Sequence, residues 1–408
     1  MSEKTIRKCS ACGTSPINHK LLFTINLIDE ITERLGNILC NKFSCSPTTK
    51  KSKEWRNLAS LVEKIVFTSM SYVGIVGFNY DMEKAVTGRS KLIWEEAEKR
   101  GIAMSQLKMF GKPVELYRAR INDNRTSYFY FKSLPIPTHL EQSGYDWLDD
   151  KFILFKKLTD NIQNNIPVPK TKKILSWKNA VDSFRELSKP IILKPQHGSR
   201  GRHTTTNINT EKELRDAFDL GREITLSMIL QEHLHGSVYR ATVINNELVG
   251  FFRGDLPEII GDGKKNIREQ ISDKNKIRHE RVSEISINDD LVNFIKRQGY
   301  TTESILSKNA TLALSAKTGR MYGSYTREML PEVHPKMHAI FKKAGEIVSA
   351  PVVGFDLIIE DPTKDPDLQK WGIIECNSLP FIDLHYFALE GPKINLAENV
   401  WDLWEKTF

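Results

Sequence analysis

An acidic and an amide side chain stand two residues apart at the end of an apolar run near the C-terminus. In WGIIECNSLPFIDLH, Glu375 and Asn377 follow Ile373 and Ile374, which have the character of a strand interior. Because side chains alternate along a strand, Glu375 and Asn377 would point to the same side. One charged and one neutral oxygen ligand side by side suit a hard cation such as Mg²⁺. The alternative is a strand end capped by polar residues before Pro380.

A second carboxylate lies inside another apolar run. Asp356 interrupts VVGFDLIIED, and an ionised carboxylate is rarely buried without a partner or a metal. Together with Glu375 and Asn377, Asp356 would complete an all-oxygen set for Mg²⁺, which also keeps waters and nucleotide phosphates as ligands.

The segment IILKPQHGSRGR combines a strand, a lysine and a loop bracketed by Gly198 and Gly201. Glycines let the backbone approach an anion closely, and successive amides form a phosphate-binding concavity. Lys194 at the strand end supplies a point charge for phosphate oxygens. An ordinary hairpin turn can have the same composition, and neither the P-loop nor the dinucleotide motif is present. A phosphate-binding loop combined with a magnesium set predicts a nucleoside-triphosphate site.

The composition of the whole chain excludes several classes of protein. With 408 residues, 40% of them hydrophobic, we expect two or three domains with a sizeable core. No run of about 18 apolar residues appears, and MSEKTIRKCSACG lacks the apolar region of a secretory signal, so we expect a cytoplasmic protein without a membrane partner. The net charge of +8 and the pI near 9.0 permit anionic partners, but the bases are scattered.

Four of the five cysteines lie in the first 45 residues. Cys9 and Cys12 form a CxxCG knuckle, and Cys40 and Cys45 form a second pair with looser spacing. These thiols could hold a structural Zn²⁺, or they could be reduced cysteines without a ligand role. A nucleic-acid-binding zinc knuckle would need clustered bases and stacking aromatic residues, which are sparse here, so nucleic acid is a disfavoured partner.

The elements that would position these residues fall into two patterns. Helical spacing of apolar residues predicts helices over 21–39, 54–76 and 90–102, and short aromatic or β-branched segments over 104–135 predict strands, so we expect a small α/β domain ending near residue 137. From about residue 150 the pattern is that of an α+β core. Helices are expected over 149–169, 211–221 and 334–348, and strands over 191–195, 227–234, 239–254, 310–317, 319–328, 352–361 and 371–377.

The order of these segments resembles the ATP-grasp superfamily over roughly residues 148–404. The segments that carry the resemblance are DDK…NNIPVP, IILKPQHGSRGR, ILQEHLHGSVYRATVINNELVGFFRG, IIGDGKKNI, VHP, GFDLII and IIECNSLPFIDLH. IIGDGKKNI followed by VHP and ECN…H…EG is similar to the ATP-grasp domains of cyanophycin synthetases and bifunctional glutathione synthetases. The resemblance implies an α+β fold in which two α+β subdomains grip ATP, preceded by a smaller α/β domain. The expected domains are a cysteine-containing segment with a candidate zinc knuckle (1–50), an α/β domain (51–147) and the ATP-grasp catalytic domain (148–408).

The resemblance also implies the ligands of ATP and of two Mg²⁺ ions. Asp356, Glu375 and Asn377 would hold the metal. The nucleotide would be bound by the two lysines, the loop and the adenine-binding segment: Lys151, Lys194, His197, Gly198, Ser199, Gly201, Gln231, Glu232 and Leu234. The catalytic candidates are Lys194 and two arginines, Arg240 and Arg253, which would neutralise charge on the γ-phosphate and on an acyl phosphate.

The activity that the resemblance implies is an ATP-dependent ligase, which joins a carboxylate to an amine through an acyl phosphate and uses amino acids or peptides. Arg253, Arg320, Arg327 and Lys336 favour acidic substrates if they line the acceptor pocket, or form a solvated surface if they do not. Arg327 and His385 are the candidate substrate contacts. The alternative function is a zinc-knuckle nucleic-acid-binding or regulatory ATP-binding protein without ligase activity. Formation of a homo-oligomer is left open.

Overall fold

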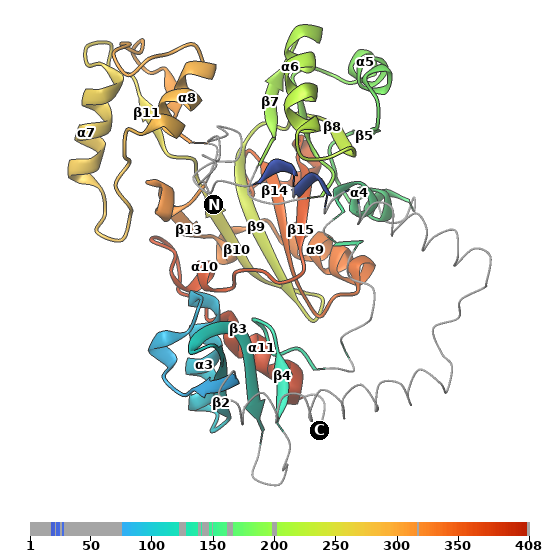
Figure 1. Cartoon of the computed structure of the whole chain (residues 1–408), viewed down its shortest axis with the longest axis vertical. Coiled ribbons are helices and arrows are strands. Elements are labelled where there is room, and N and C mark those ends of the chain that lie inside the picture. Colours follow the sequence, from blue (N-terminus) through green and yellow to red (C-terminus); the bar gives the residue numbers. More distant parts are fainter. Residues whose placement is uncertain are drawn as a thin grey trace, which may run out of the picture. The chain divides into compact units, whose positions relative to one another are not determined.

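The computed structural model describes residues 18–20, 22–24, 27, 76–121, 128–137, 140, 147–148, 150–160, 166–197, 202–315 and 318–405. The chain divides into two compact units (Figure 1). The larger unit takes the described residues up to 27 with those of 142–380 and 384–394, and the smaller takes those of 28–141, 381–383 and 395–408. Within these residues, no helix combines the length and apolar character needed to cross a membrane.

The smaller unit contains an antiparallel four-stranded sheet in the order β1-β2-β3-β4. Its elements are β1 (Val76–Asn79), the 3-10 turn η1 (Met82–Lys84), α3 (Gly88–Lys99), β2 (Ala103–Met109), β3 (Lys112–Arg120), β4 (Phe129–Phe131) and α11 (Leu396–Glu405). The helix predicted over 90–102 and strands within 104–135 are confirmed. Of the helix predicted over 54–76 only Val76 is described, and it begins β1; most of the helix predicted over 21–39 also lies outside the described residues.

The last helix belongs to the smaller unit, although the expected ATP-grasp domain ran to residue 408. Leu396, Ala397, Val400 and Trp401 are buried at helical spacing on α11. The indole nitrogen of Trp401 donates to the carbonyl of Ile93 on α3 at 2.9 Å. The larger unit therefore ends before α11, because the apolar face of α11 packs on α3.

The larger unit contains a four-stranded, a five-stranded and a two-stranded sheet, all antiparallel among the described residues. The four-stranded sheet has the order β5-β8-β6-β7. It is formed by β5 (Thr171–Ile174), β6 (Ile191–Pro195), β7 (Thr205–Ile208) and β8 (Met228–Glu232), with α5 (Trp177–Glu186) and α6 (Glu211–Arg222) packed on it (Figure 1). Thr210 caps α6 and Glu213 returns the bond to the cap, so the start of this helix is fixed locally.

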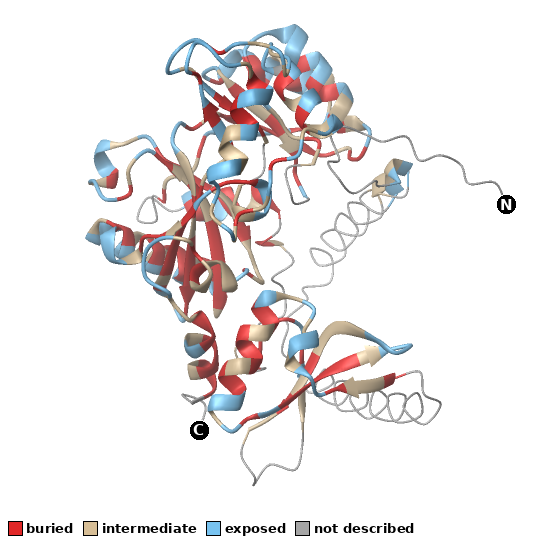
Figure 2. Ribbon diagram, turned by 90° about the vertical axis from the view of Figure 1, so that its left-hand side faces the viewer, coloured by how far each residue is buried: buried red, intermediate tan, exposed pale blue. Residues whose placement is uncertain are grey.

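The second sheet has five strands in the order β13-β10-β9-β14-β15. They are β9 (Ser237–Ile244), β10 (Glu247–Gly254), β13 (Thr326–Glu328), β14 (Val352–Ile359) and β15 (Gly372–Asn377). One face packs against α4 (Lys151–Thr159) and α9 (Pro335–Val348) through residues such as Tyr239, Phe251, Phe341, Phe355 and Leu357. Figure 2 shows buried residues along these strands. Because side chains alternate, the intervening polar residues lie on the opposite face.

A third, two-stranded sheet pairs β11 (Glu258–Ile260) with β12 (Thr311–Ala313), beside α7 (Ile267–Ile277) and α8 (Asp289–Arg297). The strand predicted over 319–328 is reduced to β13, because the 3-10 turn η4 (Arg320–Tyr322) lies between Gly319 and Gly323, which both have positive φ. The remaining short elements are η5 (Leu330–Glu332), η6 (Pro366–Leu368) and α10 (Asp383–Tyr386).

Candidate functional site

A row of charged residues crosses three adjacent strands of the five-stranded sheet. Asp356 on β14 lies directly opposite Arg240 on β9 and Glu375 on β15. Gly354, two residues before Asp356, lies opposite Asn377. Directly opposite residues of antiparallel strands project to the same face, so the structure brings the three predicted metal ligands together on the polar face of the sheet. We call Arg240, Asp356 and Glu375 the charged row.

Asp356 and Arg240 form a bidentate ion pair. Arg240 Nε donates to Oδ1 at 2.7 Å and Nη2 donates to Oδ2 at 2.8 Å. Asn377 Nδ2 also donates to Oδ2, at 3.3 Å. Burial opposes the charge on Arg240, but Asp356 outweighs it and raises the pKa of the guanidinium. Arg240, predicted to contact the γ-phosphate, therefore orients the Asp356 carboxylate in this structure.

Glu375 has a carboxylate whose charge is disfavoured. Burial raises its pKa, and nearby Asp356 raises it further, while Lys151, Lys194 and Arg240 act in the opposite direction. Among the described residues, no hydrogen bond to its carboxylate is seen. A cation between Asp356 and Glu375 would relieve their repulsion, and Asp356 Oδ1 keeps a second acceptor site beside its bond from Arg240. The oxygen donor set therefore fits Mg²⁺.

Two lysines approach this row from other elements of the larger unit. Lys151 begins α4 and is buried, and Lys194 lies on β6. Lys194 Nζ donates to the carbonyl of Ile374 at 3.4 Å, where the β14–β15 pairing shifts register. Burial lowers the pKa of Lys194 to about 7, helped by Lys151 and opposed by Glu375 and Asp356. Strand irregularities of this kind are common beside active sites. Here the irregularity leaves the Ile374 carbonyl to accept from Lys194, which lies near enough to Asp356 and Glu375 to be influenced by their charges.

Asp150 fixes the start of α4 and so the position of Lys151. Its Oδ1 accepts from the amides of Phe152 and Ile153 at 2.8 and 3.0 Å. Its Oδ2 accepts from Gln196 Nε2 at 2.5 Å and lies 3.5 Å from His197 Nε2. His197, a predicted nucleotide contact, is therefore held at the end of β6. The other predicted loop residues, Gly198, Ser199 and Gly201, lie outside the described residues, as do Cys9, Cys12, Cys40 and Cys45.

The predicted adenine segment follows β8 and uses its side chains internally. Gln231 Nε2 donates to Thr171 Oγ1 at 2.8 Å. Glu232 Oε1 accepts from the amide of Ser188 at 3.1 Å. Burial opposes the charge on Glu232, but this bond and Lys370 lower its pKa. Leu234, the last residue of the segment, is buried. Any bonds from this segment to a base would come from its backbone.

The structure does not bring the second arginine to the charged row. Arg253 on β10 lies opposite Tyr239 and Arg327, whereas its neighbour Phe252 lies opposite Arg240. Strand alternation thus puts Arg253 and Arg327 on the other face of the sheet. Arg253 pairs with Asp255 at 2.6 Å, and Arg327 pairs with both oxygens of Glu332 at 2.8 and 2.9 Å.

The other two predicted acceptor-pocket bases also have neighbours within the chain. Lys336 contacts Asp365 at 2.7 Å and Asp367 at 2.5 Å. The guanidinium carbon of Arg320 lies 5.5 Å from the centre of the Phe387 ring. Three of the four predicted bases are therefore already paired with carboxylates.

His385, predicted to contact substrate, lies in a fully buried polar cluster instead. Its Nδ1 donates to Glu328 Oε2 at 2.5 Å, and its Nε2 lies 2.7 Å from Thr242 Oγ1. Glu328 Oε1 also accepts from the amide of Phe251 at 2.8 Å. A Cβ atom on Gly250 would lie 2.5 Å from the His385 ring, so only glycine leaves room for it. Sequence reasoning missed Glu328 and Thr242; a glycine in mid-strand was the available signal.

Comparison with known proteins agrees with the fold. No family model matches the chain. Cyanophycin synthetase of Geminocystis herdmanii is 29% identical over 247 residues, covering 58% of this chain and 28% of that protein. The glutathione biosynthesis bifunctional protein GshAB of Clostridium perfringens is 27% identical over 252 residues, covering 59% and 32%. The crystal structure of a bifunctional glutathione synthetase from Pasteurella multocida matches with a TM-score of 0.52 and 21% identity, over 78% of this chain and 44% of that one.

The larger unit has an ATP-grasp fold, as the motif order predicted. The matched region is similar in sequence to cyanophycin synthetases and bifunctional glutathione synthetases. The chain spans about a third or less of the length of these curated relatives.

Proposed function

We propose that this chain is an ATP-dependent ligase that joins a carboxylate to an amine through an acyl phosphate. The observation that carries the proposal is the convergence of Lys151 and Lys194 on the face that bears Asp356, Glu375 and Asn377. Cations for phosphate oxygens and oxygen ligands for Mg²⁺ meet there, which is the combination that a nucleoside triphosphate requires.

In the proposed reaction, Lys151 and Lys194 hold the α- and β-phosphates of ATP. Asp356, Glu375 and Asn377 would hold Mg²⁺, two ions by resemblance to the family, which when bound would neutralise charge on the phosphates. Arg240 keeps the Asp356 carboxylate oriented through its two hydrogen bonds. The residues of this chain therefore act by positioning and charge, as in phosphoryl transfer generally.

The bond changes are those of two successive displacements. An oxygen of the substrate carboxylate attacks the γ-phosphorus, the bond to the β-phosphate oxygen breaks, and ADP leaves. The substrate amine then attacks the acyl-phosphate carbon, inorganic phosphate leaves, and the amine loses a proton as the amide forms. Exclusion of water by the closed site would protect the acyl phosphate from hydrolysis.

The substrate class follows from the relatives rather than from a pocket. The similar proteins are named cyanophycin synthetase and glutathione biosynthesis protein. We infer that amino acids or peptides supply both the carboxylate and the amine.

A panel of amino acids and dipeptides, assayed for ADP release with MgATP, tests the proposal. We expect ADP release to depend on at least one carboxylate and one amine together, and hydroxylamine added with the carboxylate alone to trap the acyl phosphate as a hydroxamate. ATP binding without turnover across the panel would instead favour a regulatory ATP-binding protein. Absence of binding at millimolar ATP would contradict the proposal altogether.

A further inference from the structure

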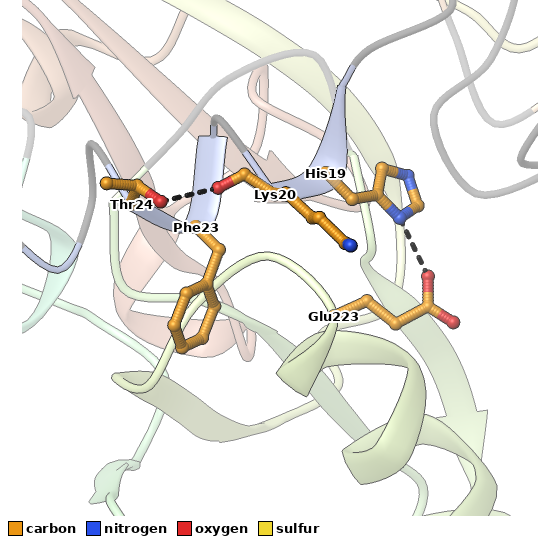
Figure 3. Close-up of a pocket in the computed structure, with 5 residues that line it drawn as sticks. All are labelled: His19, Lys20, Phe23, Thr24 and Glu223. Carbon is orange, nitrogen blue, oxygen red and sulfur yellow. Dashed lines mark hydrogen bonds and ion pairs between the residues drawn. The ribbon is translucent and has the colours of Figure 1, made fainter. Parts of the chain in front are cut away.

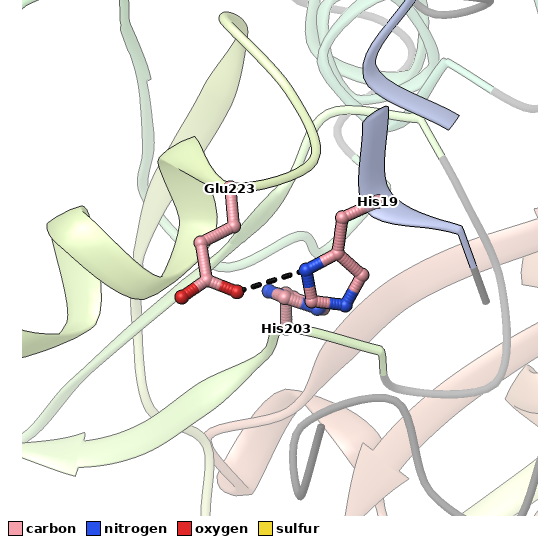
Figure 4. Close-up of side chains that lie close together, drawn as sticks. All are labelled: His19, His203 and Glu223. Atoms are coloured by element: carbon pink, nitrogen blue, oxygen red, sulfur yellow. Dashed lines mark ion pairs between the residues drawn. The ribbon is translucent and has the colours of Figure 1, made fainter. Parts of the chain in front are cut away.

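Three metal-ligating side chains from three separate segments of the larger unit converge away from the charged row. They are His19 in the helical residues 19–20, His203 shortly before β7, and Glu223 at the end of α6 (Figure 4). One ligand atom from each lies within 4.8 Å of the others. His19 Nδ1 lies 3.0 Å from Glu223 Oε2, and the two imidazole rings are 5.0 Å apart at 74°.

The orientation of His203 is set by a bond on its other side. His203 is buried, and its Nδ1 lies 2.7 Å from the carbonyl oxygen of Leu220. A carbonyl only accepts, so Nδ1 carries the proton and Nε2 is the nitrogen with a lone pair. Histidines that bind metals commonly donate their other ring N–H to a carbonyl or carboxylate, which fixes tautomer and orientation.

The backbone of His203 is also unusual. Its φ of 49° lies in the left-handed region, which is uncommon for residues other than glycine, although Asn, Asp and His adopt it more often than most. Such conformations are costly and cluster at ligand-binding and functional positions.

A cavity of about 460 Å³ adjoins the cluster and is lined by His19, Lys20, Phe23, Thr24 and Glu223 (Figure 3). No member of the charged row lines this cavity. It offers room for water at a coordination position that the three side chains do not fill.

We propose that His19, His203 and Glu223 bind a divalent transition metal, with Zn²⁺ as the best fit, and that the metal ties the N-terminal segment to the ATP-grasp unit. Two imidazoles and a carboxylate suit Zn²⁺, whereas Mg²⁺ and Ca²⁺ prefer oxygen ligands alone. Three protein ligands with one water complete a tetrahedral site. In the sequence His203 follows Gly201 by two residues, so the metal would also anchor the downstream end of the predicted phosphate loop.

The test must separate this site from the N-terminal cysteines. We suggest titrating the full chain with Zn²⁺ alone in a background where Cys9, Cys12, Cys40 and Cys45 are all changed to Ser. We expect one equivalent of Zn²⁺ to bind. His19→Ala, Glu223→Gln or His203→Asn should each weaken Zn²⁺ affinity by at least about tenfold, because even the loss of a group that only supports a ligand has an effect of that size. Asparagine is chosen because it tolerates the left-handed backbone. His279→Ala, outside the cluster, is the matched control and should bind as before.

Absence of Zn²⁺ binding in the cysteine-free chain, or unchanged affinity in all three ligand variants, would overturn the proposal. If the cysteine-free chain does not fold, Co²⁺ bound to the wild-type chain gives the same decision. Nitrogen and oxygen ligation produces visible d–d absorption without the near-ultraviolet band of a thiolate, and His203→Asn should remove that absorption. A spectrum with thiolate bands only, unaltered in His203→Asn, would contradict the site.

Discussion

Two polar clusters share one face of the five-stranded sheet and differ in how their charges are satisfied. In the cluster of Glu328, His385 and Thr242, all three side chains are fully buried, and both nitrogens of His385 have partners in the chain. In the charged row, Asp356 and Arg240 are 17% and 16% exposed, and the Glu375 carboxyl has a raised pKa. The first cluster is complete without a ligand, whereas the second would be stabilised by a bound cation and phosphates. We therefore expect substitutions in the buried cluster to change stability and substitutions in the charged row to change activity.

The largest expected effect is loss of turnover from Glu375→Gln. Because this change removes one of the two carboxylates proposed to hold the metal, we expect the rate to fall by about 10²–10³-fold or more. The free energy of unfolding should stay nearly constant, since the change keeps the backbone pairing of β15 and no hydrogen bond to the Glu375 carboxylate is seen among the described residues. Steady-state ADP release measures the rate, and chemical denaturation measures the free energy of unfolding. Glu247→Gln, an exposed glutamate on β10, is the control. Full activity in Glu375→Gln would remove the metal assignment.

The buried cluster should respond in the opposite way. His385→Ala leaves the Glu328 carboxylate buried without its ring partner, so we expect the free energy of unfolding to fall by about 3–5 kcal/mol. ATP affinity of the fraction that remains folded should change by less than about twofold. Urea denaturation followed by fluorescence measures the first quantity, and nucleotide titration the second. A variant as stable as the wild type, but inactive, would move His385 back to the substrate site.

Lys194→Met should weaken ATP binding by about 10–100-fold, since one charge-assisted contact with phosphate is lost. The pKa of Lys194, lowered by burial to about 7, also predicts a proton effect. Near pH 7 only about half of the lysines are charged, and phosphates favour the charged form, so ATP binding should take up a fraction of a proton. Calorimetry in buffers of different ionisation enthalpy measures this uptake. It should disappear in Lys194→Met and persist in Lys342→Met, an exposed lysine on α9.

A preference for acidic substrates is the smallest expected effect. Arg253, Arg327 and Lys336 already pair with carboxylates, so a substrate carboxylate would have to replace an existing partner. We therefore expect glutamate-containing peptides to be favoured over alanine-containing ones by no more than about 1 kcal/mol, and less at high salt. Competition assays at two ionic strengths measure it. A preference greater than about 50-fold would mean that these pairs open on binding.

Local patterns predicted the parts of the site that lie on single strands. Alternation along 371–377 put Glu375 and Asn377 on one face, and an acid inside an apolar run singled out Asp356, and the strand register agrees with both. The placement of Lys151 next to this set came from the motif order, not from spacing. Those residues are near one another only because β6, α4 and β15 meet in the folded unit.

The contacts that sequence reasoning missed all depend on long-range pairing. The register that places Arg240 opposite Asp356 joins residues 116 positions apart, and the bond from His385 to Glu328 joins residues 57 apart. Nothing in the sequence near Leu396 indicates that α11 packs on α3 rather than on the ATP-grasp unit. Propensity and periodicity predict elements, but the partner of each apolar or charged face is decided by tertiary packing.

In the proposed site, Asp356, Glu375 and Asn377 hold a divalent cation together with ATP. Isothermal titration of the wild type and Glu375→Gln with ATP, each with and without Mg²⁺, tests this arrangement. We expect Mg²⁺ to raise the ATP affinity of the wild type by at least about tenfold, because the metal would join phosphates to the carboxylates. We expect Glu375→Gln to lose most of this gain while retaining metal-free binding through the lysines. Equal Mg²⁺ dependence in both proteins, or no ATP binding by the wild type, would contradict it.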